Sequence, residues 1–449
     1  MSLRRFSLLA ATLAGAMGCL DSSAPAVPWL DDDLRPLLAA LDVRPLQPPA
    51  PASAVLVELG RLLMFDKVLS GNKNIACGSC HHPSYHTTDN SSLPIGEGGR
   101  HIGPARQLGT GARIPRNTPD LYNRGVTEWT RLFWDGRVAM EAGRLVTPAG
   151  SALPSEINSV LAAQAMFPVL DADEMRGHPG DTTTLGGANE LARLSESDLA
   201  GIWAAIMRRV LAIPEYRARF LAAFPTVDSA DLGFQHAALA IAAFEAATFT
   251  LLNSPFDRYL RGDAKALGDD EKRGALLFYG RARCAQCHSG PLLSDQQFHN
   301  IGSPQLGPGR PANAPEDRGR AEVTGLNQDR FAFRTPPLRN VAITGPWMHD
   351  GAYTTLVAAV AHYRNPTAAF VSYDRTQLEP ALQSEVVRDP TLAVAILSGI
   401  DPVVREPISL SDEEVQQIVA FLVALTDPTA LDQVRESPGK VPSGLPFID

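Results

Sequence analysis

Residues 77–81 read CGSCH and residues 284–288 read CAQCH. Cys-x-x-Cys-His is the attachment signature of c-type haem, in which two thiols form thioether bonds to the vinyl groups and the adjacent imidazole binds the iron. The two motifs therefore predict two covalent haems. The six attachment residues that they predict are Cys77, Cys80 and His81 for one haem and Cys284, Cys287 and His288 for the other.

Three other uses of paired cysteines fit this sequence less well. One zinc ion shared by two pairs is usually bound by pairs roughly 15 to 20 residues apart, whereas about 200 residues separate these pairs. Redox dithiols of this spacing lie next to a βαβ pattern, and neither pair is flanked by such a pattern. Disulfides are common in exported chains, but a histidine would then follow both pairs only by chance. Haem attachment accounts for the cysteines and the histidines together.

Length and composition limit the class of protein. A chain of 449 residues is long enough for two or three compact domains. Its 45% hydrophobic and 20% charged residues are typical of soluble globular proteins. The net charge of -9 argues against a nucleic-acid partner, since proteins that bind nucleic acids usually carry a basic surface.

The N-terminus reads as an export signal. Arg4 and Arg5 precede an apolar run, so we expect residues 1–18 to be a signal peptide and the protein to be periplasmic. Cleavage before Cys19 would resemble lipoprotein processing and would attach a lipid anchor, with simple secretion as the alternative. Residues 19–50 are rich in Pro and Ala, which predicts an extended tether.

A weak internal repeat predicts the fold class. The run ELGRLLMF (58–65) precedes the first haem motif and EKRGALLFYG (271–280) precedes the second, and each places a glycine among large apolar residues where another helix can cross closely. Helical patterns dominate, including a capping box at Ser411 that begins a terminal helix. We therefore expect an all-α protein of two cytochrome c-like domains. The expected ranges are 51–255 for the N-terminal domain, with an excursion loop at about 171–187, 256–430 for the C-terminal domain, and 431–449 for a tail.

Several longer stretches carry a resemblance to a known family. They read LSGNKNIACGSCHHP, PRNTPDLYN, LFWDGR, CAQCHSGPLLSDQQFHNIG and FRTPPLRNVAITGPWMHDG, in that order along the chain. Together they resemble the bacterial di-haem cytochrome c peroxidase and MauG family. The resemblance implies two haems facing a shared interface, the first reacting with hydrogen peroxide and the second exchanging electrons with a partner. The alternative is an electron-transfer cytochrome without peroxidase activity, in which both irons are six-coordinate.

The resemblance also implies roles for single residues. Trp134 matches the tryptophan that couples the two haems, although an aromatic core residue would read the same way. Glu156 matches the glutamate that moves protons above the first iron, although it could instead begin the following helix. Asn117, with the backbone carbonyls of Thr344 and Pro346, matches a calcium site between the haems, and caps or turns are the alternative.

The sequence departs from the family in the loop IGEGG. Glu97 stands where members that need reductive activation carry a histidine ligand. If His101 does not substitute, the first haem should be five-coordinate and should react with peroxide without prior reduction. Arg144 stands where many members have a glutamine beside the peroxide pocket.

The sixth ligand of the second haem has two main candidates, with a histidine or no protein ligand as the remaining alternative. In a helix that starts near Thr355, positions three, four and seven apart share a face, so Tyr363 falls on an apolar stripe and His362 does not. Met348 is the rival, because a thioether is the usual ligand in electron-carrying cytochromes c. A tyrosine favours higher oxidation states of iron, so Tyr363 would indicate a MauG-like enzyme that oxidises a protein side chain.

Partners follow from the same resemblance. We expect hydrogen peroxide as a substrate, and either a small redox protein (a cytochrome c or a cupredoxin) as the electron donor or another protein as the substrate. Family members are often homodimers.

Overall fold

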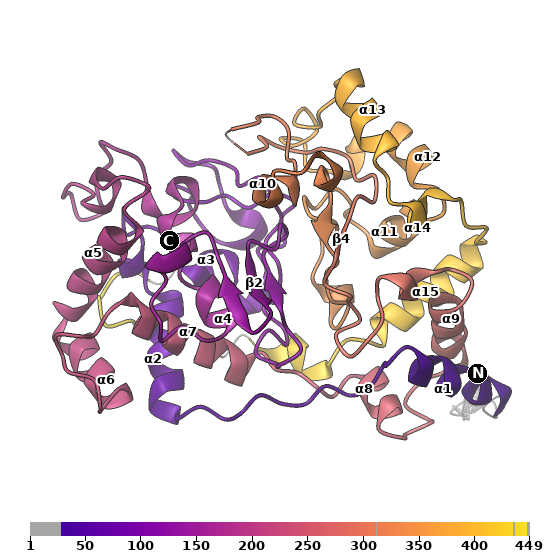
Figure 1. The fold of residues 1–449 in the computed structure, drawn as a ribbon, viewed down its shortest axis with the longest axis horizontal. Helices are drawn as coiled ribbons and strands as arrows, with labels where there is room; N and C mark the ends of the chain where they lie inside the picture. The colour runs from indigo at the N-terminus through magenta and orange to yellow at the C-terminus, as the bar shows by residue number, and fades with distance from the viewer. Residues whose placement is uncertain (1–27, 311, 434–435, 447–449) are drawn as a thin grey trace, which may run out of the picture.

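The computed structural model describes residues 28–446 except for residues 311, 434 and 435. The expected signal peptide and Cys19 lie outside the described residues. Figure 1 shows two helical halves side by side, the N-terminal half in purple and the C-terminal half in orange and yellow. Hydrophobic side chains form one large cluster in each half, and the chain passes from one cluster to the other between Leu252 and Phe256.

The N-terminal half is built around a pair of crossing helices, α2 and α7. Gly60 of α2 lies so close to α7 that a Cβ there would come 1.8 Å from the carbonyl oxygen of Ala240, which confirms the expected close crossing. Buried apolar side chains along α7 complete the core. The helices of this half are α2 (Ala54–Phe65), α3 (Cys77–Cys80), α4 (Val160–Gln164), α5 (Leu199–Leu211), α6 (Pro214–Ala223) and α7 (Phe234–Thr248).

The C-terminal half repeats this arrangement with α9 and α15. A Cβ on Gly274 of α9 would come 1.8 Å from the carbonyl oxygen of Gln417 in α15. The expected capping box is present, because Ser411 Oγ accepts from Glu414 N and Glu414 Oε2 accepts from Ser411 N. The helices are α8 (Pro255–Leu260), α9 (Asp269–Tyr279), α10 (Ala321–Thr324), α11 (Leu356–His362), α12 (Pro366–Val371), α13 (Pro390–Ser398), α14 (Pro402–Arg405) and α15 (Asp412–Val423).

Two small antiparallel sheets modify the all-α expectation. One has the order β1-β2-β3, with Leu132 opposite Val138 and Met140 opposite Leu145. The other pairs β4 with β5. The strands are β1 (Arg131–Leu132), β2 (Val138–Glu141), β3 (Arg144–Val146), β4 (Phe298–His299) and β5 (Phe333–Arg334).

The two ends of the chain cross over to the opposite halves. Part of the expected extended tether is in fact helix α1 (Pro28–Ala40), whose Leu34 and Leu38 are buried against α8 and α9. At the other end, Ala430 and Val441 belong to the core cluster of the N-terminal half. Figure 1 shows the same exchange, with α1 beside α9 and a yellow segment near the end of the chain among the helices of the N-terminal half. The tether prediction is wrong for residues 28–40. It relied on their Pro-rich composition, whereas the spacing of their apolar residues lets them form a helix that packs on the C-terminal half.

Buried ion pairs join the halves. Arg116 donates to Asp135 of its own half and to Asp317 and Glu322 of the other, with Nε 2.7 Å from Asp317 Oδ2. The guanidinium is 7% exposed and both aspartates are less so. An arginine can bind several carboxylates at once because its five N–H groups are fixed in one plane. This network holds Asp135 in place, and the preceding residue, Trp134, lines both of the cavities described below.

Candidate haem sites and the residues between them

The first cavity lies in the N-terminal half, next to the CGSCH motif. The space that it encloses is about 1390 Å³, counting the part that opens to solvent. Apolar side chains of α2, α4 and α7 form much of its wall, with a charged minority. Cys77, Cys80 and His81 line it together, as haem attachment requires.

Both motif histidines are oriented for metal binding. His81 Nδ1 lies 3.1 Å from the carbonyl oxygen of Thr87, and His288 Nδ1 lies 2.9 Å from that of Leu293. A carbonyl can only accept, so each Nδ1 carries the proton and each Nε2 is left as the metal-binding nitrogen. Burial lowers the pKa of His81 to about 4 and lowers that of His288 as well, which keeps both rings neutral. The residues present therefore fit a histidine-ligated, thioether-bound haem in each half.

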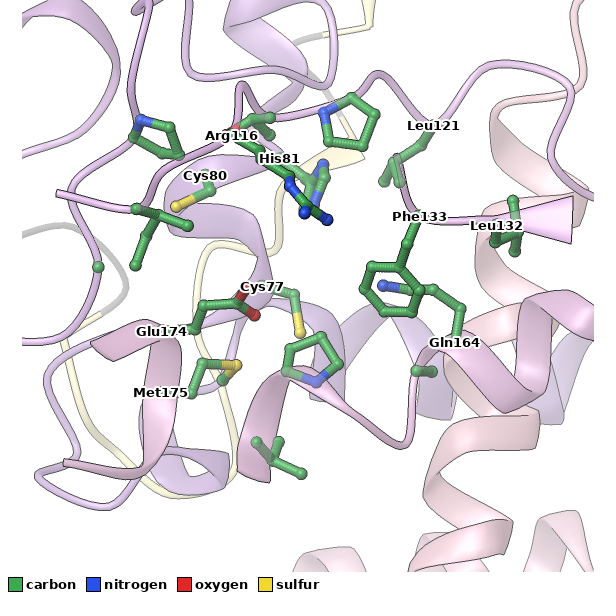
Figure 2. Close-up of a pocket in the computed structure, with 18 of the residues that line it drawn as sticks. Cys77, Cys80, His81, Arg116, Leu121, Leu132, Phe133, Gln164, Glu174 and Met175 are labelled. Atoms are coloured by element: carbon green, nitrogen blue, oxygen red, sulfur yellow. The ribbon is translucent and has the colours of Figure 1, made fainter. Parts of the chain in front are cut away.

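A carboxyl faces the first cavity, and it belongs to Glu174. This residue lies in a π-helical turn (Ala172–Arg176) whose first N–H groups donate to the side chain of Asp171. Burial and the charge of Asp171 raise the pKa of Glu174 to about 7, against the opposing effect of three arginines. Figure 2 shows Glu174, Gln164 and His81 around the same open space.

The structure does not bring the sequence-predicted Glu156 to this cavity. Glu156 is exposed in the turn before α4, where Ser155 Oγ lies 3.3 Å from its Oε2. Arg144 is also exposed, on the outer strand β3. The turn that holds Glu156 leaves its side chain exposed, whereas the π-helical turn after α4 places Glu174 on the cavity wall. The run QAMFPVLDADEM, with its glutamine and glutamate ten positions apart, was the signal that could have located Gln164 and Glu174.

Glu245 of α7 is a second buried carboxyl on the cavity wall. Burial raises its pKa to about 8, partly offset by Arg124, and its Oε2 accepts no hydrogen bond in the described part of the chain.

The IGEGG loop contributes no imidazole to the first cavity. Glu97 is buried and accepts hydrogen bonds from Asn72 and Asn74, both at 2.6 Å, so its carboxylate is occupied. His101 is exposed. Among the described residues that line the cavity, His81 is the only histidine.

The second cavity lies in the C-terminal half and has an empty volume of about 1290 Å³. Cys284 and Cys287, in and just after a short 3-10 turn, and His288 line one side of it. Apolar side chains of α9, α11 and α15 line much of the rest. His299 of β4 also reaches this cavity and lies between Asp295 and Asp401, at 3.0 and 2.7 Å. These two carboxylates raise the pKa of His299.

Helix α11 presents the stripe that its sequence predicts. Thr355 caps the helix by accepting from Ala358 N. His362 points away from the cavity, since its Nδ1 lies 2.8 Å from Tyr353 Oη and its Nε2 lies 2.7 Å from the carbonyl oxygen of Ile301. Met348 also lines the cavity, from a turn where its φ is +73°, so both candidate ligands face the same space. The residues of the stripe that line the cavity are Leu356, Ala359, Val360 and Tyr363.

Trp134 and Arg334 line both cavities. The backbone N–H of Arg334 donates to the carbonyl of Trp134 at 2.8 Å, which ties strand β5 of one half to the other half. Gly136 follows Trp134 with a φ of +66°, and a Cβ there would strike the ring of Phe298. The sequence placed Trp134 between the haems, and the structure places its side chain at the wall of both cavities.

Asn117, one of the expected calcium ligands, lies beside Trp134, whose Nε1 donates to its carbonyl. Asn117 Nδ2 donates to the carbonyls of Ser91 and Ser92, and its N–H donates to the carbonyl of His349 at 2.7 Å. Its Oδ1 accepts no hydrogen bond from the residues that the structure describes. Thr344 and Pro346 precede Met348 in the C-terminal half.

Two cavities, each with a Cys-x-x-Cys-His motif on its wall and a tryptophan shared between them, define a protein of the di-haem c-type class. The chain belongs to the di-haem cytochrome c peroxidase family. The family model described as di-haem cytochrome c peroxidase matches residues 54–265. The chain is 30% identical to cytochrome c551 peroxidase of Pseudomonas aeruginosa, covering 80% of this chain and 83% of that protein. It is an oxidoreductase of the cytochrome c peroxidase type.

Relatives with the MauG name are equally similar. Methylamine utilization protein MauG of Methylorubrum extorquens is 29% identical, over 88% of this chain and 87% of that protein. Among solved structures, a MauG-like protein associated with microbial copper homeostasis is 27% identical with a TM-score of 0.59, covering 88% of this chain and 96% of that one. The family thus includes peroxidases and MauG-like proteins, and both roles suit its members.

Proposed function

We propose that this protein reduces hydrogen peroxide at the haem of the N-terminal half and receives electrons through the haem of the C-terminal half. The observation that carries the proposal is the carboxyl of Glu174 facing the cavity that His81 lines. A bound c-type haem supplies an iron that binds peroxide and passes electrons singly. Peroxide then takes up two electrons and two protons to give two water molecules.

Glu174 is suited to move the protons of this reaction. A general base must accept the proton of the first oxygen, and the same group as an acid must return it to the departing oxygen. A pKa near neutrality serves both steps, and burial raises the pKa of Glu174 to about 7. Gln164 lies across the same space and offers an amide that can orient peroxide.

Trp134 is proposed as the path for electrons between the halves. Its indole lines both cavities, and its Nε1 donates to the carbonyl of Asn117 at 2.9 Å, which holds the ring in one orientation. The Arg116 network keeps the two halves in register beside it.

Tyr363 is proposed as the sixth ligand of the second haem, with Met348 as the alternative. Burial raises the pKa of Tyr363, so only a strong Lewis acid such as iron would hold it as a phenolate. A phenolate favours oxidised iron, which would let the protein hold the oxidising equivalents of peroxide and pass them to a protein side chain, as in a MauG-like enzyme. Met348 would instead favour turnover with a soluble donor.

The calcium site and the periplasmic location complete the proposal. Asn117 Oδ1 and the carbonyls of Thr344 and Pro346 would bind one Ca²⁺ between the haems, since hard oxygen ligands suit this ion. The donor would be a small redox protein, with lipid attachment at Cys19 and a homodimer as further expectations. In the described part of the chain no helix is long and apolar enough to cross a membrane.

One experiment separates the candidate functions. Stoichiometric peroxide is added to the oxidised protein as isolated, and spectra are recorded with and without reduced cytochrome c. The proposal expects a rapid change of the haem spectrum without prior reduction, because neither Glu97 nor His101 offers a ligand to the first cavity. An unchanged spectrum would favour the alternative of an electron-transfer cytochrome without peroxidase activity. Oxidation of added cytochrome c would distinguish a peroxidase with a soluble donor from the MauG-like variant.

A further inference from the structure

Arg334 lies at the boundary of the two halves, in strand β5, and lines both cavities. Its side chain is only 3% exposed. Nε donates to the carbonyl of Phe133 at 3.0 Å and Nη1 donates to that of Thr335 at 3.1 Å. The guanidinium carbon lies 5.1 Å from the ring centre of Trp129. Arg334 is thus held rigidly by groups that carry no net charge.

The charge of Arg334 forms no ion pair with a carboxylate in the described part of the chain. Arg116, at similar burial, meets three carboxylates, and Arg339 meets Asp257. An arginine has five N–H donors, yet Nη2 of Arg334 donates to none of the described residues. Burial and the nearby Arg124 lower the pKa of Arg334 to about 9, against the smaller opposing effect of the more distant Asp120 and Asp135, so it remains a cation at neutral pH.

A buried cation without a carboxylate in contact is costly, and such charges are usually paired or bind a ligand of opposite sign. The unused N–H groups of Arg334 sit where the cavities approach each other. Every haem carries two propionate carboxylates, which are anionic at neutral pH. A planar guanidinium can bind two carboxylates at once, in contrast to the point charge of a lysine.

We propose that Arg334 is a shared cationic anchor that binds propionates of both haems and sets the reduction potentials of both together. The proposal rests on the two-haem assignment above, but not on peroxidase activity. Reduction adds negative charge to a haem, so a fixed cation beside it favours the reduced form. Because one side chain lines both cavities, its removal should affect both haems in the same direction. Arg334 is therefore a positioning residue, since it acts through the haem carboxylates.

The test measures both midpoint potentials of the haem-loaded protein by spectroelectrochemistry. Arg334→Gln should shift both potentials to more negative values. Arg334→Lys should keep both potentials close to those of the wild-type protein, because it keeps the charge. Haem content, from the pyridine haemochrome spectrum, establishes that equal numbers of haems are compared. Arg334→Met removes the same charge without burying an unpaired amide, so it replaces Arg334→Gln if that variant does not fold.

Arg283→Gln is the matched control. Arg283 lines the second cavity alone and donates to the carbonyl of Glu406 near the surface, so its removal should leave the first potential unchanged. Unaltered potentials at both haems in a loaded Arg334→Gln or Arg334→Met protein would overturn the proposal, as would a shift at one haem only. Peroxide turnover of the wild-type protein is assayed separately, so a failed peroxidase assignment would leave this result interpretable.

Discussion

The indole Nε1 of Trp134 donates a hydrogen bond to the backbone carbonyl of Asn117 at 2.9 Å, and the same ring lines the cavities of both halves. Asn117 follows Arg116, whose guanidinium binds Asp135, the residue after Trp134. The ring is therefore held from both sides by one buried network. Its orientation depends on contacts between residues that lie far apart in the chain.

Replacement of Trp134 by Phe should slow electron transfer between the haems, because the ring that spans both cavities becomes smaller and loses its hydrogen bond. We expect a decrease of at least about tenfold, equivalent to about 1.4 kcal/mol in the barrier. Rapid mixing of the half-reduced protein with peroxide measures this rate. Trp203→Phe is the control, since Trp203 is buried and hydrogen-bonded to the carbonyl of Met166 but lines neither cavity. Equal rates in the two variants would contradict the proposed path.

Replacement of Glu174 by Gln should lower the rate of peroxide cleavage by roughly 10²- to 10⁴-fold, the usual contribution of a positioned acid–base group. Peroxide binding should change less, because the amide keeps the size of the side chain. Glu156→Gln should leave the rate near that of wild type, since Glu156 is exposed outside the cavity. A large loss in Glu156→Gln with none in Glu174→Gln would restore the assignment made from sequence.

The pH dependence of the peroxide reaction should follow the ionisation of Glu174. The carboxylate form accepts the first proton, so the rate should rise with pH through about 7, the value to which burial raises this pKa. This rise should disappear in Glu174→Gln. The folded protein holds this proton up to about pH 7 and the unfolded chain releases it near the ordinary value of about 4.3. The contribution of Glu174 to stability should therefore fall as pH rises between these values, which unfolding of wild type and variant at several pH values would measure.

Replacement of Tyr363 by Phe should leave the second iron without its sixth ligand, giving a high-spin spectrum. Met348→Leu should leave the spin state unchanged, because Leu fills a similar volume and the proposed ligand is retained. Electron paramagnetic resonance of the oxidised protein distinguishes the spin states. A high-spin second haem in Met348→Leu alone would make Met348 the ligand.

Replacement of Arg116 by Met should lower the free energy of unfolding of the haem-loaded protein by about 3–5 kcal/mol, because it leaves buried carboxylates without their cation. Denaturant unfolding followed by haem absorbance measures the change. Arg219→Met should cost at most about 1 kcal/mol, since the Arg219 pair with Glu215 is on the surface. A loss in Arg116→Met no greater than in this control would show that the network does not stabilise the contact between the halves.

The attachment sites could be predicted from sequence because they are local patterns. Thioether attachment needs two cysteines and a histidine at fixed spacing, and helical phase places Tyr363 on the face that lines the second cavity. Gly60 and Gly274 predict close helix crossings because only a glycine lets two backbones approach so closely. These features depend on covalent geometry and on the periods of regular structure.

Only the tertiary structure decided which carboxyl faces the first cavity. Glu156 lies in an exposed turn and Glu174 lies on the cavity wall, a difference that the order of residues along the chain does not reveal. The crossing of α1 and of the C-terminal tail to the opposite halves was also undetermined, because apolar residues specify burial without specifying a partner. The sequence by itself determined the two attachment motifs and the helical faces. The position of Arg334 on the wall of both cavities arises from long-range packing, which no local pattern encodes.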